Sequence, residues 1–170
     1  MDGFVYMSEQ VHSELRAYSD APALFSPHPL FENFGERVER SEACVRLGLD
    51  PANRYVLFFG LIRDYKGLDL LLDAWAQLRR AGRTEGRRLI VAGEFYTARE
   101  PYLNRIADNG LQDEVLLHDR FIPDDDVKYY FSAADFVVQP YKTATQSGVT
   151  QIAYQYCVPM DVTKVGGLAE

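Results

Sequence analysis

The feature that most constrains the fold of this chain is a regular alternation of short apolar runs and helical stretches from about residue 55 onward. YVLFFG is a continuous apolar run ended by glycine, which is typical of a strand buried on both faces. Strands that alternate with helices predict a parallel sheet with helices on both faces, that is, an α/β Rossmann-like fold. We expect strands at 55–60, 87–93, 114–119, 135–140 and 158–163, and helices at 68–82, 99–110, 123–134 and 147–157.

The first fifty residues do not share this pattern. Residues 2–18 predict one strand and one helix, and residues 36–50 predict a helix packed on the later domain. Residues 21–35 contain three prolines and are expected to form an irregular connection. The final VGGLAE looks like the entry to another helix, so we expect the chain to be part of a longer protein.

Composition and charge exclude several classes of function. The net charge of −7 argues against a general nucleic-acid-binding protein, although it is compatible with a small basic site for one phosphorylated ligand. No apolar run is long enough to span a membrane, and the three histidines show no metal-ligand spacing, so we expect no metal site. Cys44 and Cys157 are far apart in the sequence and are expected to be two buried thiols.

The strongest candidate site follows the first strand. Sheets of this kind bind ligands beyond the carboxyl ends of their strands. In FFGLIRDYKG, Arg63 and Lys66 come after Gly60 and just before a helix. A helix N-terminus carries partial positive charge, so two cations beside it suit a diphosphate. The alternative is a solvated loop in which the cations pair with Asp64 and Asp69.

The next two strand ends offer residues that can recognise other parts of a ligand. Glu94 follows Gly93 after the second strand and can accept a hydrogen bond from a hydroxyl, or the two residues form a simple turn. Phe121 and Ile122 follow the third strand and can pack on a flat base, or Phe121 is a core residue.

The loops after the last two strands offer close approach to an anion. Gln146, Ser147 and Gly148 precede or begin a helix whose first backbone N–H groups can face an anion, or they belong to a flexible surface loop. Gly166 and Gly167 let the backbone approach a ligand, or they form a helix-entry turn. No Ser–His–acid set, CxxC pair, Walker motif or GxGxxG fingerprint occurs in the sequence.

Taken together, these stretches resemble the C-terminal, donor-binding domain of retaining GT-B glycosyltransferases that use nucleotide-diphosphate sugars. GLIRDYKG, FIPDDDVKYYFSAADFVVQPY and ATQSGVTQIAYQYCVPMDVTKVGGLAE carry the resemblance, which covers roughly two thirds of the chain. It implies that residues 1–50 are an inter-domain segment with lead-in helices. Residues 51–170 would be the nucleotide-sugar donor-binding domain, truncated at its C-terminal end.

The resemblance also implies roles for individual residues. The cationic pair would hold the donor diphosphate and stabilise the leaving nucleotide, and the loop after the third strand would border the base. Ser147, Gly148 and Val149 would line the phosphates through their backbone, while Gly166 and Gly167 would lie near the donor sugar.

One departure from the family pattern concerns the ribose. Many members carry two glutamates eight positions apart in the last block, and the second binds the ribose hydroxyls. Those positions hold Ala144 and Ile152 here, and Gln146 or Gln151 are the available substitutes.

The function implied by the resemblance is transfer of a sugar from a nucleotide-diphosphate sugar to an acceptor hydroxyl with retention, by a hexosyltransferase of polysaccharide or glycolipid synthesis in the cytoplasm. No cofactor is implied beyond the donor substrate. The implied partners are the nucleotide sugar, an N-terminal acceptor domain that this chain lacks, and a membrane touched peripherally by that domain. We therefore expect this part alone to transfer no sugar.

Two other functions fit the same residues. A non-catalytic nucleotide- or sugar-phosphate-binding module would bind without turnover. A nucleotide-sugar epimerase of the same fold would need acid/base carboxylates in the cleft, for which Glu94 is the obvious candidate. A signalling receiver domain does not fit, because no acidic pair precedes the first strand.

Overall fold

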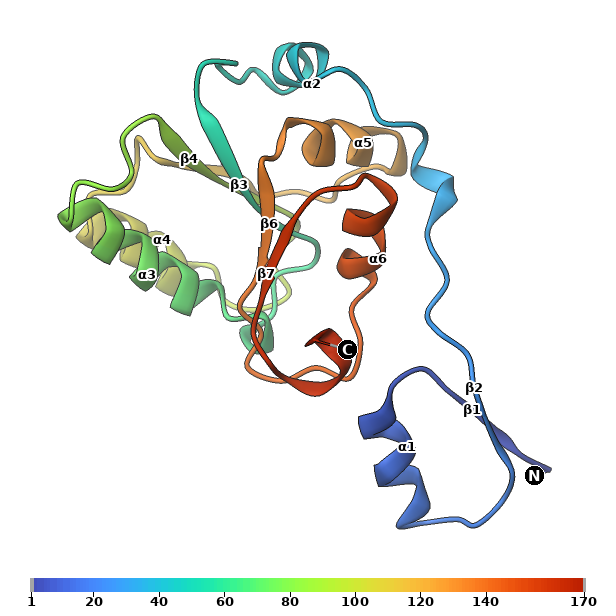
Figure 1. Cartoon of the computed structure of the whole chain (residues 1–170). Helices are drawn as coiled ribbons and strands as arrows, with labels where there is room; N and C mark the ends of the chain where they lie inside the picture. Colours follow the sequence, from blue (N-terminus) through green and yellow to red (C-terminus); the bar gives the residue numbers. More distant parts are fainter. Residues whose placement is uncertain (1, 170) are drawn as a thin grey trace.

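The computed structural model describes residues 2–169 and contains a five-stranded parallel sheet in the order β5-β4-β3-β6-β7 (Figure 1). The strands are β3 (Arg54–Phe59), β4 (Arg87–Ala92), β5 (Val115–His118), β6 (Phe136–Gln139) and β7 (Met160–Val162). All five predicted strands are confirmed, and each neighbouring pair is parallel. The chain runs from β3 outward to β5 and then returns to the other side of β3 as β6. Ligands of open α/β sheets bind at such a reversal of strand order.

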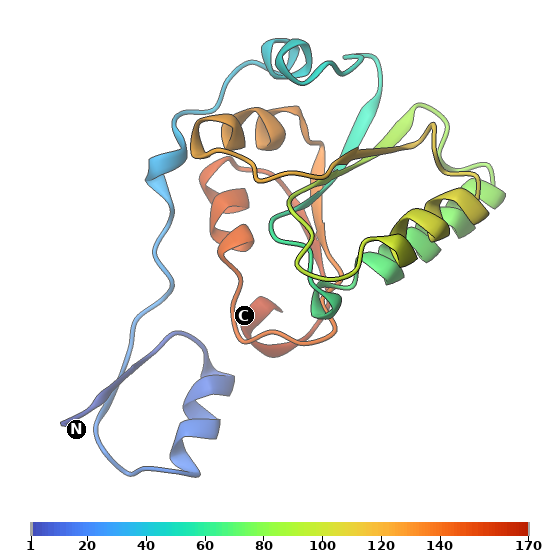
Figure 2. The ribbon, with the colours of Figure 1, turned by 180° about the vertical axis from the view of Figure 1, so that it is seen from behind.

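Helices cover both faces of this sheet, as the sequence predicts (Figures 1 and 2). One face carries α3 (Leu68–Arg80) and α4 (Glu100–Asp108), and the other carries α2 (Arg40–Leu47), α5 (Asp124–Ala133) and α6 (Gly148–Gln155). No helix within the described residues is both long and apolar enough to cross a membrane.

The central strand shows why its sequence is apolar throughout. Tyr55, Leu57 and Phe59 face the core formed with α2, α5 and α6. Val56 and Phe58 face the second core, formed with α3 and α4. Both sides of β3 are therefore buried, and a strand of this kind has no solvent-facing position for a polar side chain.

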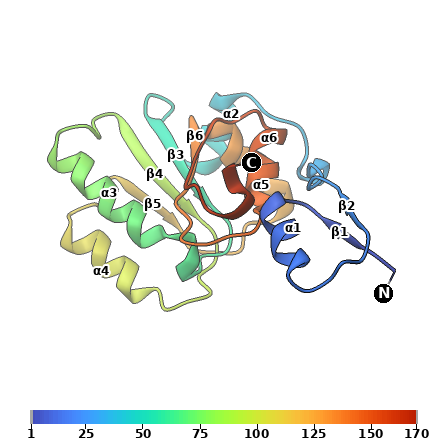
Figure 3. The same cartoon turned by 60° about the horizontal axis from the view of Figure 1, so that its bottom comes forward.

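The amino-terminal residues form a small unit beside this domain (Figure 3). β1 (Phe4–Tyr6) pairs in parallel with β2 (Ala23–Phe25), and α1 (Glu9–Arg16) connects them. The prediction that residues 21–35 are wholly irregular is wrong at β2. The prolines at 22 and 27 flank this strand rather than interrupt it, and the carbonyl of Pro22 accepts a hydrogen bond from the Phe4 N–H at 2.9 Å.

Two further expectations need correction. The helix expected at 36–50 covers only α2, which ends at Gly48 in a left-handed conformation with φ 68°; it does pack on the later domain, against α5. The expectation of two buried thiols is wrong for Cys157, which is exposed, while Cys44 is buried. Cys157 lies in the turn after α6 with φ 53°, outside the packed face of that helix.

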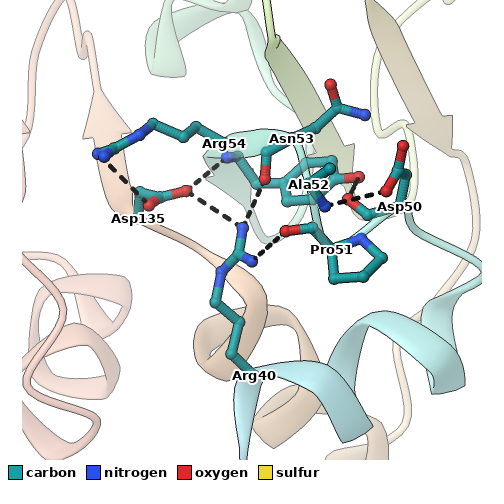
Figure 4. Close-up of polar contacts among 8 residues, drawn as sticks. Arg40, Asp50, Pro51, Ala52, Asn53, Arg54 and Asp135 are labelled. Atoms are coloured by element: carbon teal, nitrogen blue, oxygen red, sulfur yellow. Dashed lines mark hydrogen bonds and ion pairs between the residues drawn. The ribbon is translucent and has the colours of Figure 1, made fainter.

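Polar contacts tie the amino ends of β3 and β6 together (Figure 4). Asp135 accepts a hydrogen bond from the backbone N–H of Tyr55 at 2.7 Å and lies 3.6 Å from the Arg40 guanidinium. Arg40 also donates to the carbonyls of Pro51 and Asn53 at 2.7 and 2.6 Å. This network fixes the sheet at the end opposite the carboxyl ends of its strands.

We expect Asp135→Ala to lower the free energy of unfolding by about 1–3 kcal/mol, because the Tyr55 N–H and Arg40 lose an acceptor. Urea unfolding followed by circular dichroism measures the change. Asp113→Ala is the matched control, since Asp113 is exposed and forms no ion pair within residues 2–169. Equal stability of the two variants would contradict this role of Asp135.

Candidate functional site

The loop after β3 is held tightly against the end of β6. Gly60 leaves the strand with φ 94°, and Gly67 ends the short helix η2 (Asp64–Lys66) with φ 70°. A Cβ on Gly67 would collide with the carbonyl of Pro140, so only glycine fits at this approach. The loop that carries the predicted cations therefore has a fixed path across the reversal point of the sheet.

Lys66 is buried at this point, with 8% of its surface exposed. A Cβ placed on Gly60 would lie 3.0 Å from Lys66 Nζ and 3.5 Å from a methyl carbon of Val149. The structure thus brings Gly60, Lys66 and Val149 together, three residues that are separate in the sequence. Burial, with a smaller contribution from the positive charge of Arg63, lowers the pKa of Lys66 to about 8.

Neither predicted cation has an ionic partner among the described residues. The two cations do not pair with Asp64 and Asp69, which was the alternative. Asp69 pairs with Lys142 at 2.8 Å, and Asp64 accepts a hydrogen bond from the Tyr102 hydroxyl at 3.0 Å. Arg63 is exposed, and its guanidinium lies 5.2 Å from the centroid of the Tyr96 ring. Both cations are therefore free to bind an anion.

The start of α6 lies close to Lys66, since Val149 and Lys66 Nζ both approach Gly60. Ser147 is the N-cap residue, but its side chain makes no capping hydrogen bond; its Oγ lies 3.3 Å from the Tyr141 hydroxyl instead. The first N–H groups of α6 and the positive end of its dipole add to the charge of Lys66. This arrangement can bind a phosphate group.

An apolar pocket of about 170 Å³ adjoins the cationic loop. It brings together four residues that the sequence singles out, Gly60, Glu94, Phe121 and Ile122. Phe121 is 64% exposed, whereas Ile122 is buried. An apolar pocket with a few polar groups at its edge, next to a phosphate-binding corner, has the chemistry to bind a nucleoside diphosphate.

Of the glycines near the C-terminus, Gly166 packs against the loop after β6 and Gly167 against the amino-terminal unit. A Cβ on Gly166 would collide with the carbonyl of Ala144, and one on Gly167 would lie 2.6 Å from Cβ of Ser8. The Gln146 side-chain amide donates to the carbonyl of Met7 at 2.8 Å. These contacts explain why small residues occur at 166 and 167, and a role of these residues toward a donor sugar stays a prediction.

Sequence reasoning missed two aromatic residues of this region. Phe34, in the short helix η1 (Glu32–Phe34), lines the apolar pocket. Tyr141 places its ring 5.6 Å from Lys66 Nζ. Ile152, which holds the position of the missing ribose glutamate, is buried in the core beneath α6 and is not among the residues that line the pocket. Residues 2–169 contain no cluster of His, Cys, Asp and Glu that could hold a metal ion.

Comparison with known proteins identifies the family. Residues 53–170 match the family model of glycosyl transferases group 1, so the chain belongs to this family. It is 35% identical over 134 residues to D-inositol 3-phosphate glycosyltransferase of Segniliparus rotundus, covering 76% of this chain and 29% of that protein. It is 31% identical to the lipopolysaccharide core biosynthesis mannosyltransferase LpsB of Rhizobium meliloti, covering 91% of this chain and 44% of LpsB. The chain thus spans less than half the length of these relatives.

Solved structures show the same fold. Sucrose-phosphate synthase of Thermosynechococcus elongatus matches with a TM-score of 0.82 and 22% identity, over 98% of this chain and 42% of that one. Anabaena HepE in complex with UDP-glucose matches with a TM-score of 0.76 and 20% identity, over 97% of this chain and 45% of that one. These neighbours are GT-B glycosyltransferases, so the fold expected from the sequence, one half of a GT-B fold, is confirmed.

We expect the side-chain amine of Lys66 to titrate with a midpoint at about 8. NMR of protein carrying ¹³C at the lysine ε-carbons measures this directly, and the chain has only four lysines. Lys66→Arg identifies the signal by its loss. A midpoint near the ordinary value of 10.5 would show that Lys66 is more hydrated than its burial indicates.

Proposed function

We propose that this chain is the donor-binding part of a retaining glycosyltransferase and binds a nucleotide-diphosphate sugar in the cleft at the carboxyl ends of β3, β4, β5 and β6. The observation that carries the proposal is the buried ammonium of Lys66, which has no counter-ion within the described chain and lies beside the start of α6. A buried charge without a partner is costly, and a bound diphosphate would supply the missing negative charge.

The two cations would share the diphosphate. Lys66, fixed by burial, would contact one phosphate as a point charge, while the exposed Arg63 is long enough to close over the other from the surface. The backbone N–H groups of Gly148 and Val149, at the start of α6, would complete the contacts.

The nucleoside would occupy the apolar pocket. Phe34 and Ile122 supply apolar surface for the base, and Glu94 at the pocket edge supplies an acceptor for a hydroxyl. Glu94 would thereby accept a hydrogen bond from a ribose hydroxyl, since Ile152 is an apolar residue buried in the core. Anabaena HepE, which shares the fold, is known in complex with UDP-glucose, and this supports a nucleotide sugar as the ligand class.

In the reaction itself these residues would act on the leaving group. As the bond between the anomeric carbon and the diphosphate breaks, negative charge grows on the diphosphate oxygens. Lys66 and Arg63 would stabilise that charge in the transition state more strongly than in the ground state, which lowers the barrier. Retention would follow from attack of the acceptor hydroxyl on the face that the diphosphate leaves, with the hydroxyl proton passing to the departing diphosphate.

For the whole protein we propose two domains, because the relatives are more than twice as long as the part that this chain matches. Residues 51–170 are the donor-binding domain and residues 1–50 are the segment that joins it to an acceptor domain. The acceptor would belong to a polysaccharide or glycolipid, in line with the name of LpsB, whereas D-inositol 3-phosphate glycosyltransferase is named for a small phosphorylated molecule. We place the enzyme in the cytoplasm with peripheral contact to a membrane through the acceptor domain.

We expect Lys66→Met to weaken binding of UDP or GDP by about ten- to a hundredfold, because one charge-assisted contact of ~1.5–3 kcal/mol is lost. Methionine keeps the unbranched shape and most of the length of the side chain and removes its charge. Isothermal titration calorimetry at pH 7 measures the affinity, with Lys164→Met at an exposed lysine as the control. Unchanged affinity in Lys66→Met would remove the diphosphate role.

We expect Phe34→Ala to weaken binding of the same nucleotides by about five- to a hundredfold, as loss of an aromatic contact to a base costs ~1–3 kcal/mol. Its affinity for inorganic pyrophosphate should not change, whereas Lys66→Met should bind both the nucleotides and pyrophosphate more weakly. Tyr18→Ala is the control, since Tyr18 is 89% exposed. If Phe34→Ala binds UDP and GDP like the wild type, the base does not occupy this pocket.

A further inference from the structure

The side chain of Tyr141 lies between the two halves of the candidate phosphate site. We propose that Tyr141 is a positioning residue for Lys66. Its ring keeps the ammonium of Lys66 charged and in place, and its hydroxyl forms a hydrogen bond with Ser147 at the start of α6. The part of this proposal that concerns phosphate rests on the proposed function. The part that concerns Lys66 can be tested without any ligand.

The ring of Tyr141 is fixed from several sides. Only 3% of the residue is exposed. Tyr65 packs edge-on against it, with ring centroids 5.8 Å apart and planes at 83°. Thr163 donates a hydrogen bond to the Tyr141 carbonyl at 2.6 Å, which attaches the loop to the end of β7. The next residue, Lys142, donates its backbone N–H to the Tyr65 carbonyl at 2.7 Å. The backbone at Tyr141 is thus joined to the cationic loop and to β7, and its buried ring packs against Tyr65.

The ring is a suitable partner for an ammonium that must later receive a phosphate. The Lys66 Nζ lies 5.6 Å from the ring centroid, within the range of a cation–π contact. Such a contact offsets part of the cost of burying the charge. Unlike a carboxylate, the ring brings no negative charge that would compete with a phosphate or repel it.

The other groups near Lys66 do not stabilise its charged form. The charged group that acts on it is Arg63, which favours the neutral amine. The end of β3 and the start of α6 present Gly60 and Val149, which carry no charge. Within the described residues Tyr141 is thus the side chain whose contact favours the charged form of Lys66.

The hydroxyl of Tyr141 supplies the second link. Its oxygen lies 3.3 Å from Ser147 Oγ, and both residues are buried. Burial raises the pKa of Tyr141 to about 12, so the hydroxyl stays neutral and able to hydrogen-bond across the range in which Lys66 titrates. The side chain of Tyr141 therefore contacts both Lys66 in the cationic loop and Ser147, the N-cap residue of α6.

The decisive experiment is titration of Lys66 by NMR in the ligand-free chain, using ¹³C-labelled lysine. Tyr141→Leu removes the ring, and we expect its Lys66 midpoint to fall by about 0.4–1.5 pH units. Tyr141→Phe keeps the ring and should keep the wild-type midpoint. Tyr154→Leu, at a half-exposed tyrosine on α6, is the control. An unchanged Lys66 midpoint in Tyr141→Leu would overturn the proposal, because the ring would then have no effect on the charge of Lys66.

Binding supplies a second readout. Tyr141→Leu should bind UDP at pH 8 about three- to tenfold more weakly than the wild type, and the pH above which affinity falls should shift downward with the Lys66 midpoint. Tyr141→Phe should lose less than Tyr141→Leu. If the wild type itself does not bind UDP or GDP, the proposed function fails while the ligand-free titration still decides the role of Tyr141. If Tyr141→Leu does not fold, Tyr141→Met removes the ring with less loss of volume and must show the same fall in midpoint.

Discussion

The burial of one ammonium group without a counter-ion is the constraint on which the rest of this site depends. Lys66 lies in the loop that leaves β3, and the described chain provides it with an aromatic ring and a helix start but no carboxylate. Burial lowers the pKa of this ammonium, and an anion that enters the site would stabilise its charged form. In the proposed function, a bound phosphate would supply the negative charge that this ammonium lacks.

The two ends of the sheet serve different purposes. At the amino ends of β3 and β6, Arg40 and Asp135 satisfy backbone groups and hold the strands together. At the carboxyl ends, Gly60, Gly67 and Gly93 let backbone segments come close to one another; a Cβ on Gly93 would collide with the carbonyl of Gly60. Side-chain hydrogen bonds therefore join the strands at one end, and glycines allow close backbone contacts beside the apolar pocket at the other end.

The sequence predicts much of this arrangement because the responsible signals are local. The apolar runs give the strands, and the spacing of Gly60, Arg63 and Lys66 gives the cationic loop. It does not predict that Tyr141 faces Lys66, because that contact depends on the side-by-side placement of β3 and β6, eighty residues apart. The sequence also does not predict that Phe34 lines the pocket, because its segment has the pattern of an irregular connection. β2 has only three residues and depends on pairing with β1, and Cys157 is exposed because of a left-handed turn.

The most direct test of the account is a crystal structure of this chain with a nucleoside diphosphate bound. The account predicts that a phosphate oxygen lies within hydrogen-bond distance of Lys66 Nζ and of the first N–H groups of α6, with the base in the pocket lined by Phe34 and Ile122. A diphosphate bound elsewhere, with Lys66 still facing only the ring of Tyr141, would contradict it.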